Sequence, residues 1–302
     1  MLIKTIFTML FACLAIILSA QTDRALLIAI DSYPSGSGWT KIHAENDISI
    51  VLPMLLEKGY KRENIKTLIN ERATKNAIVH ALENICEEST SGDYIYIHFS
   101  CHGQQMADDN GDEPDGLDEA LIPYDAQRWY KKDVYEGENH LRDDEFEILL
   151  NNIRKKIGSK GNVFVVLDAC HSGTADRDTD DDAYIRGTTY IFAPGNYKPT
   201  AINTNKKPSL RKGKRLSQIA IFSACQPDQI NYEYKSVKDN TYYGSLSYAF
   251  CEVMNNISED ILINELFNKL KYRMELMFIN KLRKQNPYFE STDLNEKIRI
   301  AR

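Results

Sequence analysis

Apolar runs of strand length alternate along the chain with segments whose apolar residues have helical spacing. The runs lie at residues 25–30, 65–69, 94–99, 163–167 and 219–222. Continuous runs rich in β-branched residues are typical of strands buried on both faces, as in parallel sheets covered by helices. The pattern therefore predicts an α/β fold, a three-layer sandwich whose mostly parallel central sheet is flanked by helices.

Two of the helical segments begin with residues that are typical of helix N-termini. Asp143 and Asp144 open one of them, where carboxylates suit the positive end of the helix dipole. Residues 258–260 (Ser-Glu-Asp) are expected to cap the last helix. The segments with helical spacing are 48–56, 74–85, 143–153, 245–254 and 261–278.

The N-terminus has the pattern of a secretory signal peptide. Lys4 precedes an apolar run at 5–18, and the small residues Ser19 and Ala20 follow. A run of this length with these flanks is typical of a cleaved leader, and it is too short for an ordinary transmembrane helix. We therefore expect residues 1–20 to be removed, with export to the periplasm or the cell exterior and no stable membrane insertion. A retained membrane anchor is the alternative.

Charge and cysteine content narrow the function classes. A net charge of −6 argues against a nucleic-acid partner, because binding to phosphates needs a basic surface. Of six cysteines, Cys13 lies in the leader, so five remain in the exported chain. An odd number leaves at least one thiol unpaired within the chain, which marks a candidate reactive cysteine.

Two of the predicted strands end in similar polar motifs. Strand 94–99 runs into Ser-Cys-His-Gly at 100–103, and strand 163–167 runs into Asp-Ala-Cys-His-Ser-Gly at 168–173. The carboxyl ends of neighbouring parallel strands meet at one sheet edge, so His102 and Cys170 would lie close together. An imidazole can activate a thiol, which predicts nucleophilic catalysis. Taken alone, His102 could be a structural histidine and Cys170 a small core residue. The adjacent His171 is an alternative candidate for the base.

Both motifs resemble those of the caspase-like cysteine peptidases, and the 168–173 string is similar to the metacaspase form. Segments 25–31 and 44–47 resemble the first strand and helix start of that family, and 223–250 resembles its small-subunit half. The resemblance extends over about residues 24–290. It implies a caspase-like fold with a large-subunit-like part, an exposed linker and a small-subunit-like part at 21–176, 177–217 and 218–302.

The resemblance also implies roles for individual residues. Cys170 would be the nucleophile and His102 the acid and base, with the backbone N–H groups of Gly103 and Cys170 facing the oxyanion. Carboxylates beside the nucleophile would pair with Arg or Lys, so the partners are peptides or proteins with a basic residue before the scissile bond. Ala44 stands where the family often has Cys, which leaves the choice between Arg and Lys open. The implied pocket consists of Asp47, Ser100 and Asp168.

The stretch 108–119 is rich in carboxylates and contains no basic residue. Such a density of oxygen ligands suits Ca²⁺, whereas the expected chemistry itself requires no cofactor. The spacing is not that of an EF-hand, because Glu113 stands where that loop needs glycine. A solvated acidic loop is the alternative. The resemblance to metacaspases implies the ligands Asp118, Asp143, Asp144 and Asp176.

Residues 183–217 contain no acidic residue and several basic ones, among them Arg186. A peptidase that cleaves after Arg or Lys would carry its own substrate here, so self-cleavage is expected. The alternative is a solvated loop that is never cut. The candidate sites are Lys206, Lys207, Arg211, Lys212, Lys214 and Arg215.

The function expected from the sequence is therefore that of a secreted cysteine endopeptidase, and a monomer is expected. Two alternatives stay open. One is a catalytically silent caspase-like binding module, and the other is an Arg-specific peptidase of the gingipain or clostripain type.

Overall fold

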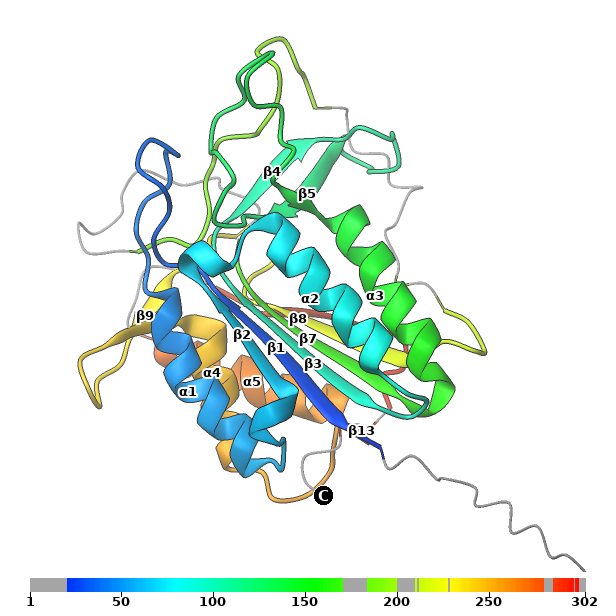
Figure 1. The fold of residues 1–302 in the computed structure, drawn as a ribbon. Helices are drawn as coiled ribbons and strands as arrows, with labels where there is room; N and C mark the ends of the chain where they lie inside the picture. Colours follow the sequence, from blue (N-terminus) through cyan, green and yellow to red (C-terminus); the bar gives the residue numbers. More distant parts are fainter. Residues whose placement is uncertain are drawn as a thin grey trace, which may run out of the picture.

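A six-stranded sheet forms the centre of the computed structural model, which describes residues 21–170, 184–199, 210, 212–227, 229–279, 285–295 and 297–298 (Figure 1). Its strand order is β12-β8-β7-β3-β1-β2. Only β12 is antiparallel to its neighbour, whereas the other pairings are parallel. The strands are β1 (Asp23–Ala29), β2 (Ile65–Ile69), β3 (Tyr94–Ser100), β7 (Asn162–Asp168), β8 (Gln218–Ser223) and β12 (Tyr288–Ser291).

Helices cover both faces of this sheet, which confirms the predicted α/β sandwich. Alternate residues of each strand face opposite sides, so Leu27 packs in one core with α1, α4 and α5, and Leu26 packs in the other with α2 and α3. Both side chains are fully buried. The helices are α1 (Ala44–Glu57), α2 (Lys75–Glu88), α3 (Asp143–Ile157), α4 (Ser245–Asn255) and α5 (Ile263–Met277).

Smaller sheets surround this centre. One of them places a strand inside the acidic stretch, which the sequence pattern had indicated as a loop, because Leu117, Ala120 and Leu121 are buried. The three-stranded sheet consists of β4 (Gly103–Ala107), β5 (Leu117–Leu121) and β6 (Leu141–Arg142). The two-stranded sheets are β9 (Glu233–Lys235) with β10 (Tyr242–Gly244), and β11 (Ile261–Leu262) with β13 (Lys297–Ile298). The 3₁₀ helices are η1 (Arg62–Asn64), η2 (Asn70–Arg72) and η3 (Gly158–Lys160).

The helix starts follow the sequence with one exception. Thr74 caps α2, since its hydroxyl accepts a hydrogen bond from the Ala77 N–H at 3.2 Å. The expected cap of α5 at 258–260 is wrong. Ile261 and Leu262 pair with β13 instead, and the helix begins at Ile263 without a side-chain cap.

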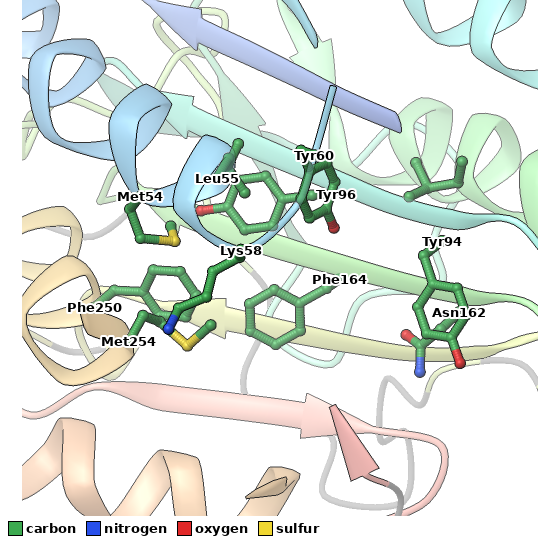
Figure 2. A pocket seen from close by; sticks show the side chains of 11 residues that line it. Met54, Leu55, Lys58, Tyr60, Tyr94, Tyr96, Asn162, Phe164, Phe250 and Met254 are labelled. Carbon is green, nitrogen blue, oxygen red and sulfur yellow. The ribbon is translucent and has the colours of Figure 1, made fainter. Parts of the chain in front are cut away.

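A pocket lined mainly by apolar side chains lies between α1, α4 and the sheet (Figure 2). Tyr94 and Asn162, the first residues of β3 and β7, contribute to its lining. The pocket is therefore at the opposite end of these strands from the sequence motifs at 100–103 and 168–173. Within the described ranges, no helix has the length and apolar character needed to cross a membrane.

Candidate functional site

Strands β3 and β7 are neighbours, and their last residues, Ser100 and Asp168, lie opposite each other in the register. His102 and Cys170 each come two residues later in the chain. The two motifs therefore leave the sheet at one edge, beyond the carboxyl ends of the strands, where α/β folds bind ligands. Both side chains are buried, with exposed fractions of 0% for His102 and 1% for Cys170.

The His102 ring is held in a defined orientation. Its Nε2 lies 2.8 Å from the carbonyl oxygen of Thr40, and the ring stacks on Trp39 with centroids 4.9 Å apart. Burial lowers the pKa of His102 to about 4, so the imidazole is neutral near pH 7. Because Nε2 must carry the proton that Thr40 accepts, Nδ1 is left as an acceptor. Nδ1 is buried and has no hydrogen-bond partner among the described residues, which is the state required of a base.

Cys170 is held through both its backbone and its thiol. Its backbone N–H donates to the carbonyl oxygen of Arg186 at 2.8 Å. Its thiol donates to the carbonyl oxygen of Gln229 at 2.9 Å, and the Cys225 sulfur lies 3.5 Å from its own. The backbone N–H that the sequence predicted to face an oxyanion therefore already holds a peptide carbonyl.

The residues predicted to form the pocket lie together and are fully buried. Asp47, in the first turn of α1, accepts hydrogen bonds from the Ser100 hydroxyl at 2.7 Å and from the Gly244 N–H at 2.8 Å. Asp168 accepts from Asn231 Nδ2 at 2.8 Å, and from both the N–H and the hydroxyl of Ser247 at 2.7 Å. Burial raises the pKa of Asp47 above its ordinary value. An isolated carboxylate pair would be costly here, so the pocket favours a cation.

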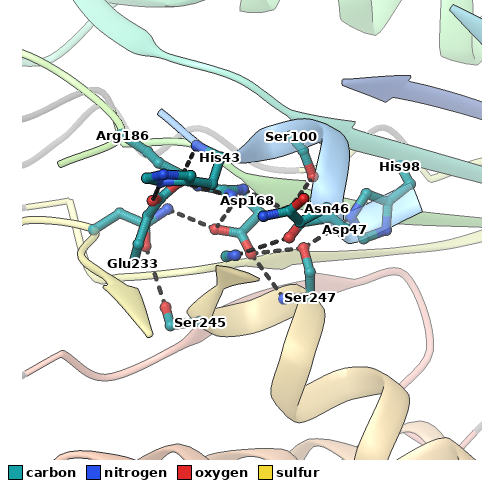
Figure 3. Close-up of polar contacts among 12 residues, drawn as sticks. His43, Asn46, Asp47, His98, Ser100, Asp168, Arg186, Glu233, Ser245 and Ser247 are labelled. Atoms are coloured by element: carbon teal, nitrogen blue, oxygen red, sulfur yellow. Dashed lines mark hydrogen bonds and ion pairs between the residues drawn. The ribbon is translucent and has the colours of Figure 1, made fainter. Parts of the chain in front are cut away.

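The guanidinium of Arg186 is the cation in this pocket (Figure 3). Its Nη1 lies 2.6 Å from Asp47 Oδ2 and 3.7 Å from Asp168 Oδ1. On its other edge, Nε and Nη2 each lie 3.1 Å from Glu233 Oε1. Burial alone would lower the pKa of Arg186, but the charges of Asp47, Asp168 and Glu233 outweigh it and raise the pKa.

This position corrects the expectation that the linker is exposed throughout. Arg186 is 0% exposed, and Thr188, Phe192 and Ser217 are buried as well. Charge pattern and composition predicted a solvated segment because they contain no information about carboxylates that are distant in the sequence and close in the fold. The candidate cleavage residues Lys206, Lys207 and Arg211 lie outside the described residues, as do His171 and Asp176.

Residues 184–186 lie alongside residues 231–233 in an extended, strand-like arrangement. Ile185 forms an antiparallel bridge with Tyr232, the Arg186 N–H donates to the Asn231 carbonyl at 3.0 Å, and the Glu233 N–H donates to the Tyr184 carbonyl at 2.9 Å. Added strands of this kind are a common mode of peptide recognition. The next residue must be small, because a Cβ on Gly187 would come within 2.4 Å of the Cys170 carbonyl oxygen.

A buried hydrogen-bond chain supports Asp168 from behind. The Tyr96 hydroxyl lies 2.8 Å from His98 Nδ1, and His98 Nε2 lies 3.0 Å from the Ser247 hydroxyl that donates to Asp168. Because Ser247 uses its proton on Asp168, its oxygen accepts from His98 Nε2–H, and His98 Nδ1 accepts from Tyr96. Burial lowers the pKa of His98 to about 4. This histidine is therefore neutral and fixed in one tautomer at pH 7.

Acidification should remove the contribution of His98 to stability. Its folded pKa lies below its ordinary value of about 6.5, so the unfolded chain takes up the proton first as the pH falls. The free energy of unfolding of Cys170→Ala should exceed that of Cys170→Ala/His98→Gln near neutral pH. This difference should shrink by about 1.4 kcal/mol per pH unit between about pH 6.5 and 4. Urea titrations at several pH values measure this. His80→Gln, at an exposed histidine, is the control, and parallel curves for His98→Gln and its parent would refute the assignment.

The acidic residues gather between β5 and the start of α3. Carboxylate oxygens of Asp109, Asp118 and Asp144 lie within 4.8 Å of one another, and so do those of Asp108, Asp112 and Asp118. Arg142 forms ion pairs with Asp118 and Asp109. Two of the predicted ligands, Asp118 and Asp144, are thus brought together.

The same region keeps buried oxygens without partners. Within the described part of the chain, Asp118 Oδ1 and Asp143 Oδ1 are buried and accept no hydrogen bond. Burial and neighbouring carboxylates raise the pKa of Asp143 to about 7, and burial raises that of Asp118 to about 6. An oxygen-binding cation would satisfy these atoms, so the residues fit Ca²⁺.

Sequence reasoning missed three residues of the site. Glu233 and His98 were given no role, and only their contacts in the folded chain connect them to the pocket. Arg186 was recognised as basic but not placed in the pocket. An Arg-Gly pair 13 residues after the nucleophile motif was the available signal, but on its own it is common in solvated loops.

Comparison with known proteins shows what the chain is similar to. Residues 22–299 match the caspase domain family. Metacaspase-2 of Arabidopsis thaliana is 25% identical over 240 residues, which are 77% of this chain and 52% of the relative. Metacaspase-1B of Aspergillus terreus is 32% identical over 276 residues, which are 78% of this chain and 68% of the relative. The chain thus spans about half of the first relative's length and about two thirds of the second's.

A crystal structure of a Geobacter sulfurreducens protein shares the fold, with a TM-score of 0.62 and 21% identity over 91% of this chain and 97% of that one. The family match covers nearly the whole sequence, and the relatives named above are metacaspases. This chain therefore belongs to the caspase domain family, as a metacaspase-like member.

Proposed function

We propose that this protein is a cysteine endopeptidase that cleaves peptide bonds after Arg or Lys. The observation that carries the proposal is Arg186, whose guanidinium lies between Asp47 and Asp168 while its carbonyl accepts from the Cys170 N–H. A bound substrate needs the same two contacts. Its basic side chain would lie in the acidic pocket, and its carbonyl would accept a hydrogen bond from the N–H of the nucleophile. An Asp-specific pocket would instead need basic residues of the enzyme around it.

The chemistry follows from the same contacts. The Cys170 thiol leaves the Gln229 carbonyl, gives its proton to Nδ1 of His102 and attacks the scissile carbonyl carbon. The N–H groups of Cys170 and Gly103 stabilise the oxyanion, and His102 then protonates the leaving amine. A water molecule hydrolyses the thioester, with His102 acting as base, and the thiol is regenerated.

Reporter peptides with Arg, Lys or Asp before the cleaved bond test this function in the mature chain, with calcium and with chelator. Arg and Lys reporters should be cleaved and the Asp reporter left intact. Cleavage of the Asp reporter, or of none of the three under either condition, would overturn the proposal. The second result would favour the binding-module alternative.

Self-processing should occur first at the Arg186–Gly187 bond. Arg186 is already in the pocket, whereas Lys212, Lys214 and Arg215 contribute nothing to it among the described contacts. Incubated wild-type protein should acquire a new N-terminus at Gly187, read by N-terminal sequencing and intact mass. Cys170→Ala should stay whole, and a Lys212→Ala/Lys214→Ala/Arg215→Ala variant should be cut as the wild type is. A first cut elsewhere contradicts this assignment.

We further propose that Ca²⁺ binds the acidic cluster, with Asp118, Asp143 and Asp144 as ligands and Arg142 displaced from Asp118. The bound charge would hold β5 to the start of α3. At about 100 times its Kd, calcium should stabilise the folded chain by about 2.7 kcal/mol, measured as a rise in Tm over chelator-treated protein. Asp118→Asn should lose this rise, whereas Glu259→Gln, at an exposed position, should keep it. A rise unaffected by Asp118→Asn would exclude this site.

Export is also proposed, on the basis of the N-terminal pattern, and so is the absence of a nucleic-acid partner, on the basis of the net charge. The monomeric state stays a prediction. Expression of the full chain in a bacterial host, followed by fractionation and N-terminal sequencing, tests the leader. A new N-terminus at Gln21 in exported material is expected, and retention of residues 1–20 would contradict it.

A further inference from the structure

Glu233 is the third carboxylate around the guanidinium, and it differs from the other two in the atoms it binds. Asp47 and Asp168 face Nη1, at one corner of the planar group. Glu233 Oε1 lies between Nε and Nη2, 3.1 Å from each, along the opposite edge (Figure 3). The pocket therefore contacts three separate nitrogen atoms from two sides.

Glu233 is also held by contacts outside the guanidinium. Its Oε1 also accepts from the His43 N–H at 2.7 Å, and its Oε2 lies 2.6 Å from His43 Nδ1. The His43 ring is held in turn by stacking on Tyr242, with centroids 5.0 Å apart. Glu233 is buried, with an exposed fraction of 7%, so it cannot turn to solvent when a ligand lacks matching donors.

A lysine cannot reproduce this set of contacts. Its ammonium places all donors on one atom, whereas the fork of a guanidinium presents them along an edge about 2 Å long. If Nζ lies by Asp47, then Glu233 Oε1 faces the apolar stem of lysine and loses both donors. A buried site built for hydrogen bonds strongly discriminates against a ligand that leaves those bonds unmade.

We propose that Glu233 makes this enzyme select Arg over Lys, through the Nε and Nη2 edge of the guanidinium. The inference rests on the proposed function, since it concerns the same pocket. It resolves the choice that the sequence left open at Ala44. Asp47 and Asp168 supply attraction for either cation, and Glu233 supplies the discrimination.

The test compares kcat/KM for matched Arg and Lys peptides in the mature wild type and in Glu233→Gln, with Glu265→Gln, at an exposed position, as the control. The wild-type preference for Arg should fall by about tenfold or more in Glu233→Gln, because a charge-assisted contact becomes a neutral one. The Arg substrate should lose its charge-assisted contact, whereas Lys cleavage should not fall, because Lys makes no such contact with Glu233. The control should keep the wild-type ratio.

A second measurement needs no variant and so does not depend on Glu233→Gln folding. A peptide whose arginine is methylated at Nε has no N–H at that atom, so it cannot donate a hydrogen bond from Nε to Glu233. The wild type should cleave it about tenfold less efficiently than the unmodified peptide. Unchanged Arg-to-Lys ratios in Glu233→Gln, or equal cleavage of the methylated peptide, would overturn the inference while the proposed function stands. Absence of any Arg or Lys cleavage by the wild type would instead overturn the function.

Discussion

Replacing Cys170 with alanine is expected to lower Arg-reporter cleavage by at least about 10³-fold, because no other group in the proposed mechanism can form the acyl intermediate. His102→Ala should have an effect of similar size, and the double variant should lose little more, since the two residues act on one step. The neutral ring of His102, with Nδ1 free of hydrogen bonds within the described residues, is the structural basis.

Initial rates measured on equal amounts of folded protein check this expectation, and circular dichroism verifies the fold. Cys251→Ala is a matched control, because that thiol is also buried but lies in α4. Its rate should stay within a few-fold of the wild type. Full activity in Cys170→Ala would assign the nucleophile elsewhere, and a biological effect that survives in this variant would favour a binding module.

Removing Arg186 is expected to destabilise the folded chain by about 3–5 kcal/mol. Arg186→Ala leaves Asp47, Asp168 and Glu233 buried without their cation, and breaking a buried ion pair by removing one partner carries a cost of this size. Chemical denaturation of Arg186→Ala/Cys170→Ala against Cys170→Ala measures the loss without self-cleavage. Arg215→Ala, at an exposed arginine, should be nearly neutral.

The same variant offers a rescue experiment. If the pocket that Arg186 occupies is the substrate pocket, a small ligand such as N-acetyl-arginine amide should bind the vacated site and raise the Tm of Arg186→Ala/Cys170→Ala. It should leave the Cys170→Ala parent unaffected, because Arg186 already fills the pocket there. N-acetyl-citrulline amide, which keeps the shape without the charge, should fail to rescue. Equal stabilisation by both ligands, or of both proteins, would contradict the pocket assignment.

Local patterns in the sequence were sufficient for the central sheet and for the edge at which the Cys and His motifs leave it. Continuous apolar runs predicted β1, β2, β3, β7 and β8 to within a few residues. A run buried on both faces needs no information beyond its own neighbours. The positions of His102 and Cys170 follow from the same logic, since strand-end residues of adjacent parallel strands meet at one edge.

Patterns failed where a distant partner outweighed local preference. Residues 258–260 look like a helix cap, but pairing with β13 draws Ile261 and Leu262 into a strand. Residues 117–121 look like part of an acidic loop, but their apolar members are buried and form β5. In both cases the contact that decides the structure joins residues that are not adjacent in the chain.

What the sequence by itself determined is the alternating α/β framework and the edge at which a thiol and an imidazole emerge, because both depend on periodicity along single strands. The tertiary structure alone decided that Arg186 is buried in a pocket of three carboxylates, which belong to α1, β7 and β9. Its charge pattern predicts exposure, since an arginine is normally hydrated. Only the convergence of Asp47, Asp168 and Glu233, which are remote from it in sequence, makes burial of that guanidinium favourable.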